Sequence, residues 1–500
     1  MSADYDGAVS KSSRNSAIRS GASADPDAAG EGPDALERAL AELWESVAAG
    51  DVLTAEMRTA AFTALPHLTN SSPEDVEKLA AALVNAGSEH HSGEESAAFF
   101  RLLISLGSRP IKREASRALA ELTEDGVYPP SWVTGIGKAV PGQAWRLHDV
   151  FGDRESIVIS FSYGETEHAL LVAVDLVETP TAGMIGVTED AEGILTTLRD
   201  NAQPFERLDP ITLAEARRRL EVPLARAGEN PDLPLDRSSV LFLPLVRSRF
   251  RRLPAGDPGQ VTVYTAADRA AAVEEFLRSP DGASAGDPDS ARFWATVLTG
   301  YSSRATDEPP AQVGPNKLAA MLLVHVPSTF TLTAAQRDGV RPAVTAWTRW
   351  ATGRQGLDEA ATDFLMMRLP EILDEFPAAY DDPSSVLLRG YLGDLATADA
   401  DLGWLADQRA RREFAMPLPA NLDADLAAID VTAPGQRTAR AVSEFAECGA
   451  EGEARDQLLT AVTRLVEEAW TNDPPATWEK ARRMLTEGHS RHDVIHRLAR

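Results

Sequence analysis

One segment constrains the fold of this chain more than any other, because its apolar residues follow a strand-like spacing. In ESIVISFSYGETEHALLVAVDL, Ile157, Ile159 and Phe161 alternate with the residues between them, and residues 169–176 form a nearly continuous apolar run. A period of two predicts β-strands, and the polar YGETEH between the two runs predicts a turn. The segment therefore predicts an antiparallel hairpin at the centre of an α+β module over residues 128–255.

The chain on both sides of this module has helical periodicity. Residues 34–127 contain five amphipathic segments with short links and predict a helical array, although no strict repeat period is visible. Residues 256–420 predict a mostly helical domain, and residues 421–500 predict a C-terminal helical block. Residues 1–33, rich in Ser, Ala, Gly and Asp, predict a disordered tail. The whole chain is thus expected to be an α+β protein that is predominantly helical.

Charge and composition limit the classes of function. The chain has 76 acidic and 49 basic residues and a net charge of −27, a field that repels phosphate backbones and anionic membrane surfaces. A nucleic-acid partner is therefore not favoured. No apolar run approaches the roughly 20 residues of a membrane span, and the N-terminus lacks the apolar core of a signal peptide. The single cysteine, Cys448, rules out an intrachain disulfide and indicates a cytoplasmic protein.

The closing segment EGHSRHDVIHRLAR holds three of the nine histidines, His489, His492 and His496. Gly488 is a natural end for one helix, and Ser490 is a natural N-cap for the next. His492 and His496 are four residues apart, the spacing that aims two imidazoles on one helix face at one Zn²⁺, and His489 would supply a third ligand. The alternative is that these are half-buried, hydrogen-bonded histidines that attach a helical hairpin to the rest of the protein. A helix-turn-helix interpretation would need a recognition helix after the last residue.

A second group of candidate residues surrounds the hairpin. His148, Asp153 and His168, with Asp149 and Glu155 beside them, would converge at a sheet edge as metal ligands or as an acid/base pair. The alternative is that the carboxylates are solvated in turns that flank the strands. The sequence contains no H-E-x-x-H, G-x-S-x-G or calcium-loop motif that would sharpen a catalytic assignment.

A basic cluster follows the module's last helical segment. Residues 236–252 predict an apolar helix, broken or kinked by Pro244, that ends in RSRFRRL. The cluster comprises Arg247, Arg249, Arg251 and Arg252. It either binds a phosphate or an acidic partner surface, or forms a basic C-terminal turn that pairs with the abundant carboxylates.

The segments LHDVFGDRES, HALLVAVD and RHDVIH resemble a family of mainly actinobacterial proteins for which no activity is known. The resemblance implies a bacterial, cytoplasmic setting and assigns no catalytic residue. We therefore expect a non-catalytic interaction or regulatory protein with a protein partner and no cofactor. One alternative is a metal-binding protein or metal-dependent hydrolase that uses Zn²⁺; a second is a nucleic-acid-associated regulator.

Overall fold

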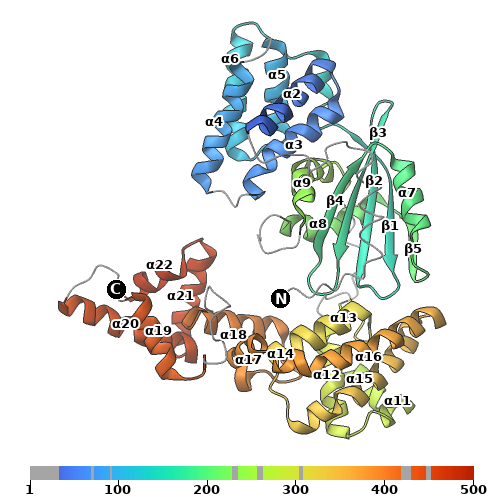
Figure 1. Ribbon diagram of the computed structural model, residues 1–500, viewed down its shortest axis with the longest axis vertical. Coiled ribbons are helices and arrows are strands. Elements are labelled where there is room, and N and C mark those ends of the chain that lie inside the picture. Colours follow the sequence, from blue (N-terminus) through green and yellow to red (C-terminus); the bar gives the residue numbers. More distant parts are fainter. Residues whose placement is uncertain are drawn as a thin grey trace. The chain divides into compact units, whose positions relative to one another are not determined.

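The computed structural model describes residues 33–68, 72–89, 93–227, 235–255, 263–302, 308–417, 429–445 and 452–499. The chain divides into two compact units, Met1–Val261 (unit 1) and Thr262–Arg500 (unit 2). Unit 1 contains helices and a five-stranded sheet, and the described part of unit 2 is built of helices (Figure 1). The predicted α+β, predominantly helical fold is confirmed. Residues 1–32 of the predicted disordered tail lie outside the described residues. The predicted division of the rest of the chain into four folded regions stays a prediction.

Unit 1 begins with the predicted helical array. Its five helices are α2 (Pro33–Ala49), α3 (Val52–Leu68), α4 (Pro73–Glu89), α5 (Gly93–Leu106) and α6 (Arg109–Glu124). Their apolar faces meet in one core that includes Leu43, Phe99 and Phe100. Helices α4 and α5 approach closely at Gly87, where a Cβ atom would lie 2.6 Å from the Phe100 ring. A glycine is needed there because the helices leave no space for a side chain.

The sheet of unit 1 is antiparallel throughout, in the order β4-β3-β2-β1-β5. Its strands are β1 (Val140–Asp149), β2 (Arg154–Tyr163), β3 (Thr166–Asp175), β4 (Thr181–Thr188) and β5 (Glu206–Ile211). Strands β2 and β3 are the predicted hairpin, and Tyr163 pairs with Thr166 at its turn. The alternation of Ile157, Ile159 and Phe161 sends these side chains to one face of the sheet, as a period of two requires.

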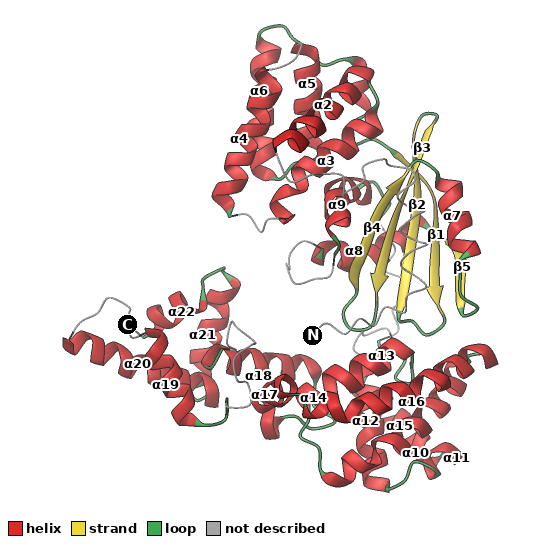
Figure 2. Cartoon of the chain, viewed as in Figure 1, coloured by secondary structure: helices red, strands yellow, loops and turns green. Residues whose placement is uncertain are grey.

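Helices cover both faces of the sheet (Figure 2). Helix α7 (Ala191–Asp200) packs on one face, where Leu195 and Leu198 share a core with Val158. Helices α8 (Leu213–Arg226) and α9 (Arg237–Phe250) pack on the other. Helix α9 runs unbroken through Pro244, so of the predicted break or kink the break does not occur. Both faces are buried because each lies against a helix layer.

The described part of unit 2 is an assembly of helices, and the last of them share an apolar core that includes Phe445, Val466 and Trp478. The helices are α10 (Ala266–Arg278), α11 (Pro280–Ala283), α12 (Pro288–Ser302), α13 (Pro315–Ala320), α14 (Val326–Thr329), α15 (Ala334–Gln355), α16 (Glu359–Asp381), α17 (Pro383–Leu392), α18 (Leu402–Ala415), α19 (Pro434–Phe445), α20 (Gly452–Thr471), α21 (Pro475–Thr486) and α22 (Arg491–Leu498). A π-helical turn, Met321–His325, joins α13 to α14. No helix in the described ranges has the length and apolar character needed to cross a bilayer.

The predicted hairpin at the end of unit 2 forms α21 and α22. Gly488 has a φ of 89°, the left-handed conformation that ends a helix, and the Ser490 hydroxyl accepts the N–H of Asp493 at 3.1 Å. Val494 and Ile495 are fully buried in the core around α20 and α21. The local sequence signals therefore place both helix ends correctly.

Candidate functional site

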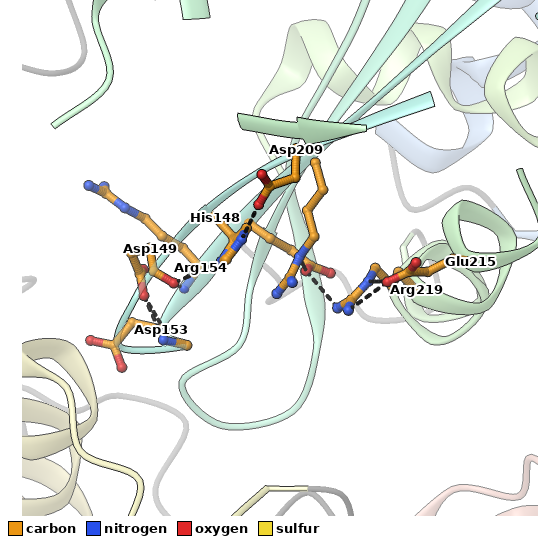
Figure 3. Close-up of polar contacts among 10 residues, drawn as sticks. His148, Asp149, Asp153, Arg154, Asp209, Glu215 and Arg219 are labelled. Carbon is orange, nitrogen blue, oxygen red and sulfur yellow. Dashed lines mark hydrogen bonds and ion pairs between the residues drawn. The ribbon is translucent and has the colours of Figure 1, made fainter. Parts of the chain in front are cut away.

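The turn between β1 and β2 is closed by a carboxylate (Figure 3). Asp149 accepts the backbone N–H groups of Gly152 at 2.6 Å, Asp153 at 3.1 Å and Arg154 at 3.0 Å. Burial raises the pKa of Asp149 above its usual value, and the three hydrogen bonds act against this shift. Asp149 thus holds the turn that the sequence places here.

His148, next to this turn, has both ring nitrogens engaged. Its Nε2 lies 3.2 Å from a carboxylate oxygen of Asp209 on β5, and its Nδ1 lies 3.1 Å from the carbonyl oxygen of Asp149 (Figure 3). These contacts fix the ring between two neighbouring strands. Asp153, in the same turn, is 1% exposed, and its carbonyl oxygen accepts the N–H of Leu176.

The structure does not bring the candidate residues His148, Asp153 and His168 together. His148 lies opposite Glu155, and His168 lies opposite Phe161 on the same strand, β2. These two β2 positions are six residues apart, which separates the histidines by about 20 Å along the strands at ~3.3 Å per residue. Asp153 lies at the His148 end. The expected convergence at one sheet edge is therefore not found.

Glu155 takes part in a separate network that ties α8 to the sheet. Its Oε2 accepts Arg146 Nε at 2.6 Å and Arg219 Nη1 at 3.0 Å. Figure 3 shows that Arg219 also contacts Glu215. The Glu155 side chain is 2% exposed. A buried carboxylate needs such partners, so this network accounts for its charge.

A fully buried ion pair lies where the helical array meets the sheet. Glu56 on α3 and Arg249 on α9 each have 0% exposed side chains, and Arg249 Nη2 lies 2.6 Å from Glu56 Oε2. The Tyr163 hydroxyl donates to the same oxygen at 2.7 Å, and the Gly137 N–H donates to Glu56 Oε1 at 2.8 Å. The carboxylate is thus satisfied by donors from three separate segments, as a buried charge requires.

His168 extends this buried cluster. Arg249 Nε donates to His168 Nε2 at 3.1 Å, and the imidazole stacks on the rings of Phe161 and Tyr163. Burial first, and then the positive charge of Arg249, lower the pKa of His168 to about 3. His168 is therefore neutral near pH 7, with its proton on Nδ1 because Nε2 accepts. Its surroundings give it a role in holding Arg249.

The terminal histidines lie near one another without sharing a centre. The His492 ring stacks on Phe445 with centroids 4.5 Å apart and an interplanar angle of 3°, and its centroid lies 6.1 Å from that of His496. His489 Nε2 lies 3.1 Å from a guanidinium nitrogen of Arg497. Within the described ranges, no group of three or more His, Cys, Asp or Glu side chains is arranged to hold a metal ion. Cys448 lies outside the described residues.

The arginines of RSRFRRL divide into a half-buried anchor, a fully buried anchor and two surface charges. Arg247 donates to the carbonyl oxygens of Leu224 and Ala227 near the end of α8, and Arg249 belongs to the buried ion pair. Arg251 and Arg252 are exposed, and neither forms an ion pair with a described carboxylate. Of the two alternatives predicted for the cluster, carboxylate pairing is found at Arg249.

A groove runs along α5 of unit 1, and we call it the α5 groove. One hollow, of about 360 Å³, lies between α5 and residues 129–138; a second, of about 530 Å³, lies between α5 and α6. Arg101 and Ile104 line both hollows, so the two hollows are neighbours on α5. The other apolar lining residues include Val133, Ile136 and Leu119. The groove thus combines an apolar floor with a polar rim, the composition typical of a binding site.

Basic side chains gather along the rim of the α5 groove. Arg101 and Lys138 are exposed, and neither forms an ion pair with a described carboxylate. At Gly137, a Cβ atom would lie 2.9 Å from Ser105 Oγ on α5 and 4.0 Å from Ser248 Oγ on α9. The groove wall and the exposed end of α9 are therefore neighbours.

Further cations lie at this end of α9. Burial, and then the positive charge of Arg251, lower the pKa of Lys112 on α6, so these two cations lie near each other. Arg252 is the next residue along the chain. We define Arg101, Lys112, Lys138, Arg251 and Arg252 as the basic rim. The rim is unusual in a chain whose net charge is −27.

Comparison with known proteins finds no matching family model, no similar curated protein and no similar solved structure. No residue role is transferred to this chain from a relative, and its function has to be argued from its own geometry. The α5 groove was not among the sequence predictions. The sequence held one signal for it, the pair of prolines in YPPSW followed by Lys138, which indicates an irregular surface segment with one cation. This signal does not specify which helix packs beside the segment.

Proposed function

We propose that this chain is a non-catalytic interaction or regulatory protein of the bacterial cytoplasm, and that it binds a protein partner in the α5 groove. The observation that carries the proposal is the groove itself: two neighbouring hollows with apolar lining on the surface of unit 1. Partner peptides dock into such grooves by burying aliphatic side chains, while polar contacts at the rim set their orientation.

The candidate catalytic residues support a structural role more than a chemical one. His148 is held between two oxygen atoms, and His168 is buried against Arg249. Each is thereby engaged in holding neighbouring segments, which favours an interaction protein over a hydrolase.

A protein partner fits the groove better than a nucleic acid does. Ile104, Val133 and Ile136 offer apolar surface, which matches aliphatic side chains and not a phosphate backbone. The net charge of −27 opposes the approach of a long polyanion over the rest of the surface.

A peptide-display selection against the full chain tests the proposal. Random peptides of about 12 residues, which span up to about 40 Å when extended, are selected and then measured singly by fluorescence anisotropy. The blocking variant is Thr134→Trp, because Thr134 is exposed and lines the groove. The matched control is Thr166→Trp, at the exposed first residue of β3.

We expect the selected peptides to lose at least about tenfold in affinity for Thr134→Trp, since a hot-spot pocket that is filled loses most of its binding energy. They should keep their affinity for Thr166→Trp. Peptides that bind both variants as they bind the unchanged chain would contradict the proposal, and so would a selection that enriches no sequence.

A further inference from the structure

We infer that the occupant of the α5 groove is an acidic segment of a partner protein, in which Asp or Glu side chains flank aliphatic ones. The inference rests on the proposed function and adds the chemistry of the partner. It follows from the basic rim, which lies directly beside the apolar floor.

Within the described ranges, no ion pair compensates the charges of Arg101 and Lys138. By contrast, two basic residues of α6 are paired: Arg113 contacts Glu77 and Glu114, and Arg117 contacts Glu114. Arg101 and Lys138 have no such partner among the described residues, although the chain carries 76 acidic residues. An acidic protein that leaves these cations unpaired beside a groove is complementary to carboxylates brought by another molecule.

The positions of the two groove cations define what the partner has to present. Arg101 borders both hollows, and Lys138 borders the hollow between α5 and residues 129–138. Between them lie Ile104 and Ile136, which are partly buried members of the helical core and expose apolar surface to the groove. A segment that places aliphatic side chains on this floor brings its neighbouring residues to the rim, where acidic residues would pair with Arg101 and Lys138.

The end of α9 extends the same preference beyond the groove. Burial and the charge of Arg251 lower the pKa of Lys112, so an anion beside these two residues would favour the charged form of Lys112. Arg252 adds a third exposed cation. A partner with acidic residues beyond its aliphatic anchor would gain from this surface as well.

The experiment uses the selected peptides and a charge-removing variant of the full chain. The variant Arg101→Gln/Lys138→Gln removes two positive charges from the groove and keeps side chains of similar length. The control Arg199→Gln/Arg207→Gln removes two exposed positive charges from α7 and β5 of the same unit. Affinity is measured by fluorescence anisotropy between about 50 mM and 500 mM salt, a range over which screening of exposed charges becomes strong.

We expect the peptides selected on the unchanged chain to be enriched in Asp and Glu beside Leu, Ile or Val. Their affinity should fall about fivefold to tenfold in Arg101→Gln/Lys138→Gln, and its dependence on salt should flatten, since each exposed ion pair contributes modestly. The control variant should change neither property.

The outcomes separate this inference from the proposed function. Peptides that bind the groove but are neutral or basic would overturn the acidic partner and leave the interaction role intact. An equal loss in both charge variants would show a general field effect and would overturn it too. Peptides whose affinity is unchanged by Thr134→Trp would overturn the proposal that the groove is the binding site.

Discussion

Replacing Arg249 with Met should strongly destabilise unit 1. The substitution leaves the carboxylate of Glu56 buried without its cation, and both side chains are 0% exposed. Removing one partner of a buried ion pair costs about 3–5 kcal/mol, since the remaining charge loses its compensation. His168 Nε2 also loses the donor that Arg249 supplies.

Hydrogen exchange of the full chain, followed by mass spectrometry, measures this cost in unit 1 and uses unit 2 as an internal reference. Peptides from β2 and β3 report the opening of unit 1, and a peptide from α15 reports unit 2. A loss of about 3–5 kcal/mol corresponds to a roughly 150-fold to 5000-fold faster exchange of the most protected unit 1 amides, at about 1.4 kcal/mol per factor of ten. Unit 2 should exchange as before.

A double-mutant cycle decides whether the loss of stability in Arg249→Met comes from the broken ion pair. Glu56→Gln removes the charge and keeps one oxygen, which can accept the Gly137 N–H, while the Tyr163 hydroxyl can accept from the new amide NH2 group. Combined with Arg249→Met, it leaves no unpaired charge, so the double variant should cost at least about 2 kcal/mol less than the sum of the two single variants. Additive costs, or less than tenfold faster exchange in Arg249→Met, would refute the argument.

Three further outcomes follow from the same structure. The folded pKa of His168 is about 3 and its ordinary value is 6.5, so the neutral ring stabilises unit 1 fully above pH 6.5, and this stabilisation is lost as the pH falls. From pH 7.5 to pH 5 the free energy of unfolding of unit 1, measured by hydrogen exchange, should fall by about 2 kcal/mol. The variant His168→Gln, which still accepts from Arg249, should lose less. Gly137→Ala should cost about 1–2 kcal/mol of stability, because φ is +68° there. The variant should also weaken peptide binding in the anisotropy assay, because its Cβ would lie 2.9 Å from Ser105 Oγ on α5. Unchanged binding would show that this turn does not shape the groove. Ser490→Ala should cost about 1 kcal/mol and raise exchange in α22 alone, and equal exchange would show that the cap contributes nothing.

Local sequence signals predicted the elements of this chain well, because the forces that define them act over a few residues. The alternation of Ile157, Ile159 and Phe161 predicted the β2–β3 hairpin, and Gly488 and Ser490 predicted the ends of α21 and α22. Pairings between distant segments were not predicted. Strand β5 joins β1 across some sixty residues of intervening chain, and no local pattern specifies that contact.

The predicted convergence of the candidate site residues is not found, for the same reason. Residue types suggested that His148 and His168 act together, but the register of β2 sets their separation, and register depends on the whole sheet. The buried partner of Arg249 was missed although one signal was present. Glu56 lies three residues after Leu53 and four before Ala60, on the buried face of α3, where a carboxylate requires a cation from elsewhere.

The buried pair and the α5 groove are parts of one arrangement. Glu56 Oε1 accepts the N–H of Gly137, and Gly137 lies between Ile136 and Lys138, which both line the groove. The carboxylate therefore holds the groove wall from inside, through a backbone group in a left-handed turn. An apolar replacement of Glu56 would leave the Gly137 N–H and the Tyr163 hydroxyl without their acceptor, at about 1–3 kcal/mol for each group that stays buried. For this reason Glu56→Gln, which keeps an acceptor, is the substitution that isolates the charge, and a leucine at the same position would disturb the groove together with the core.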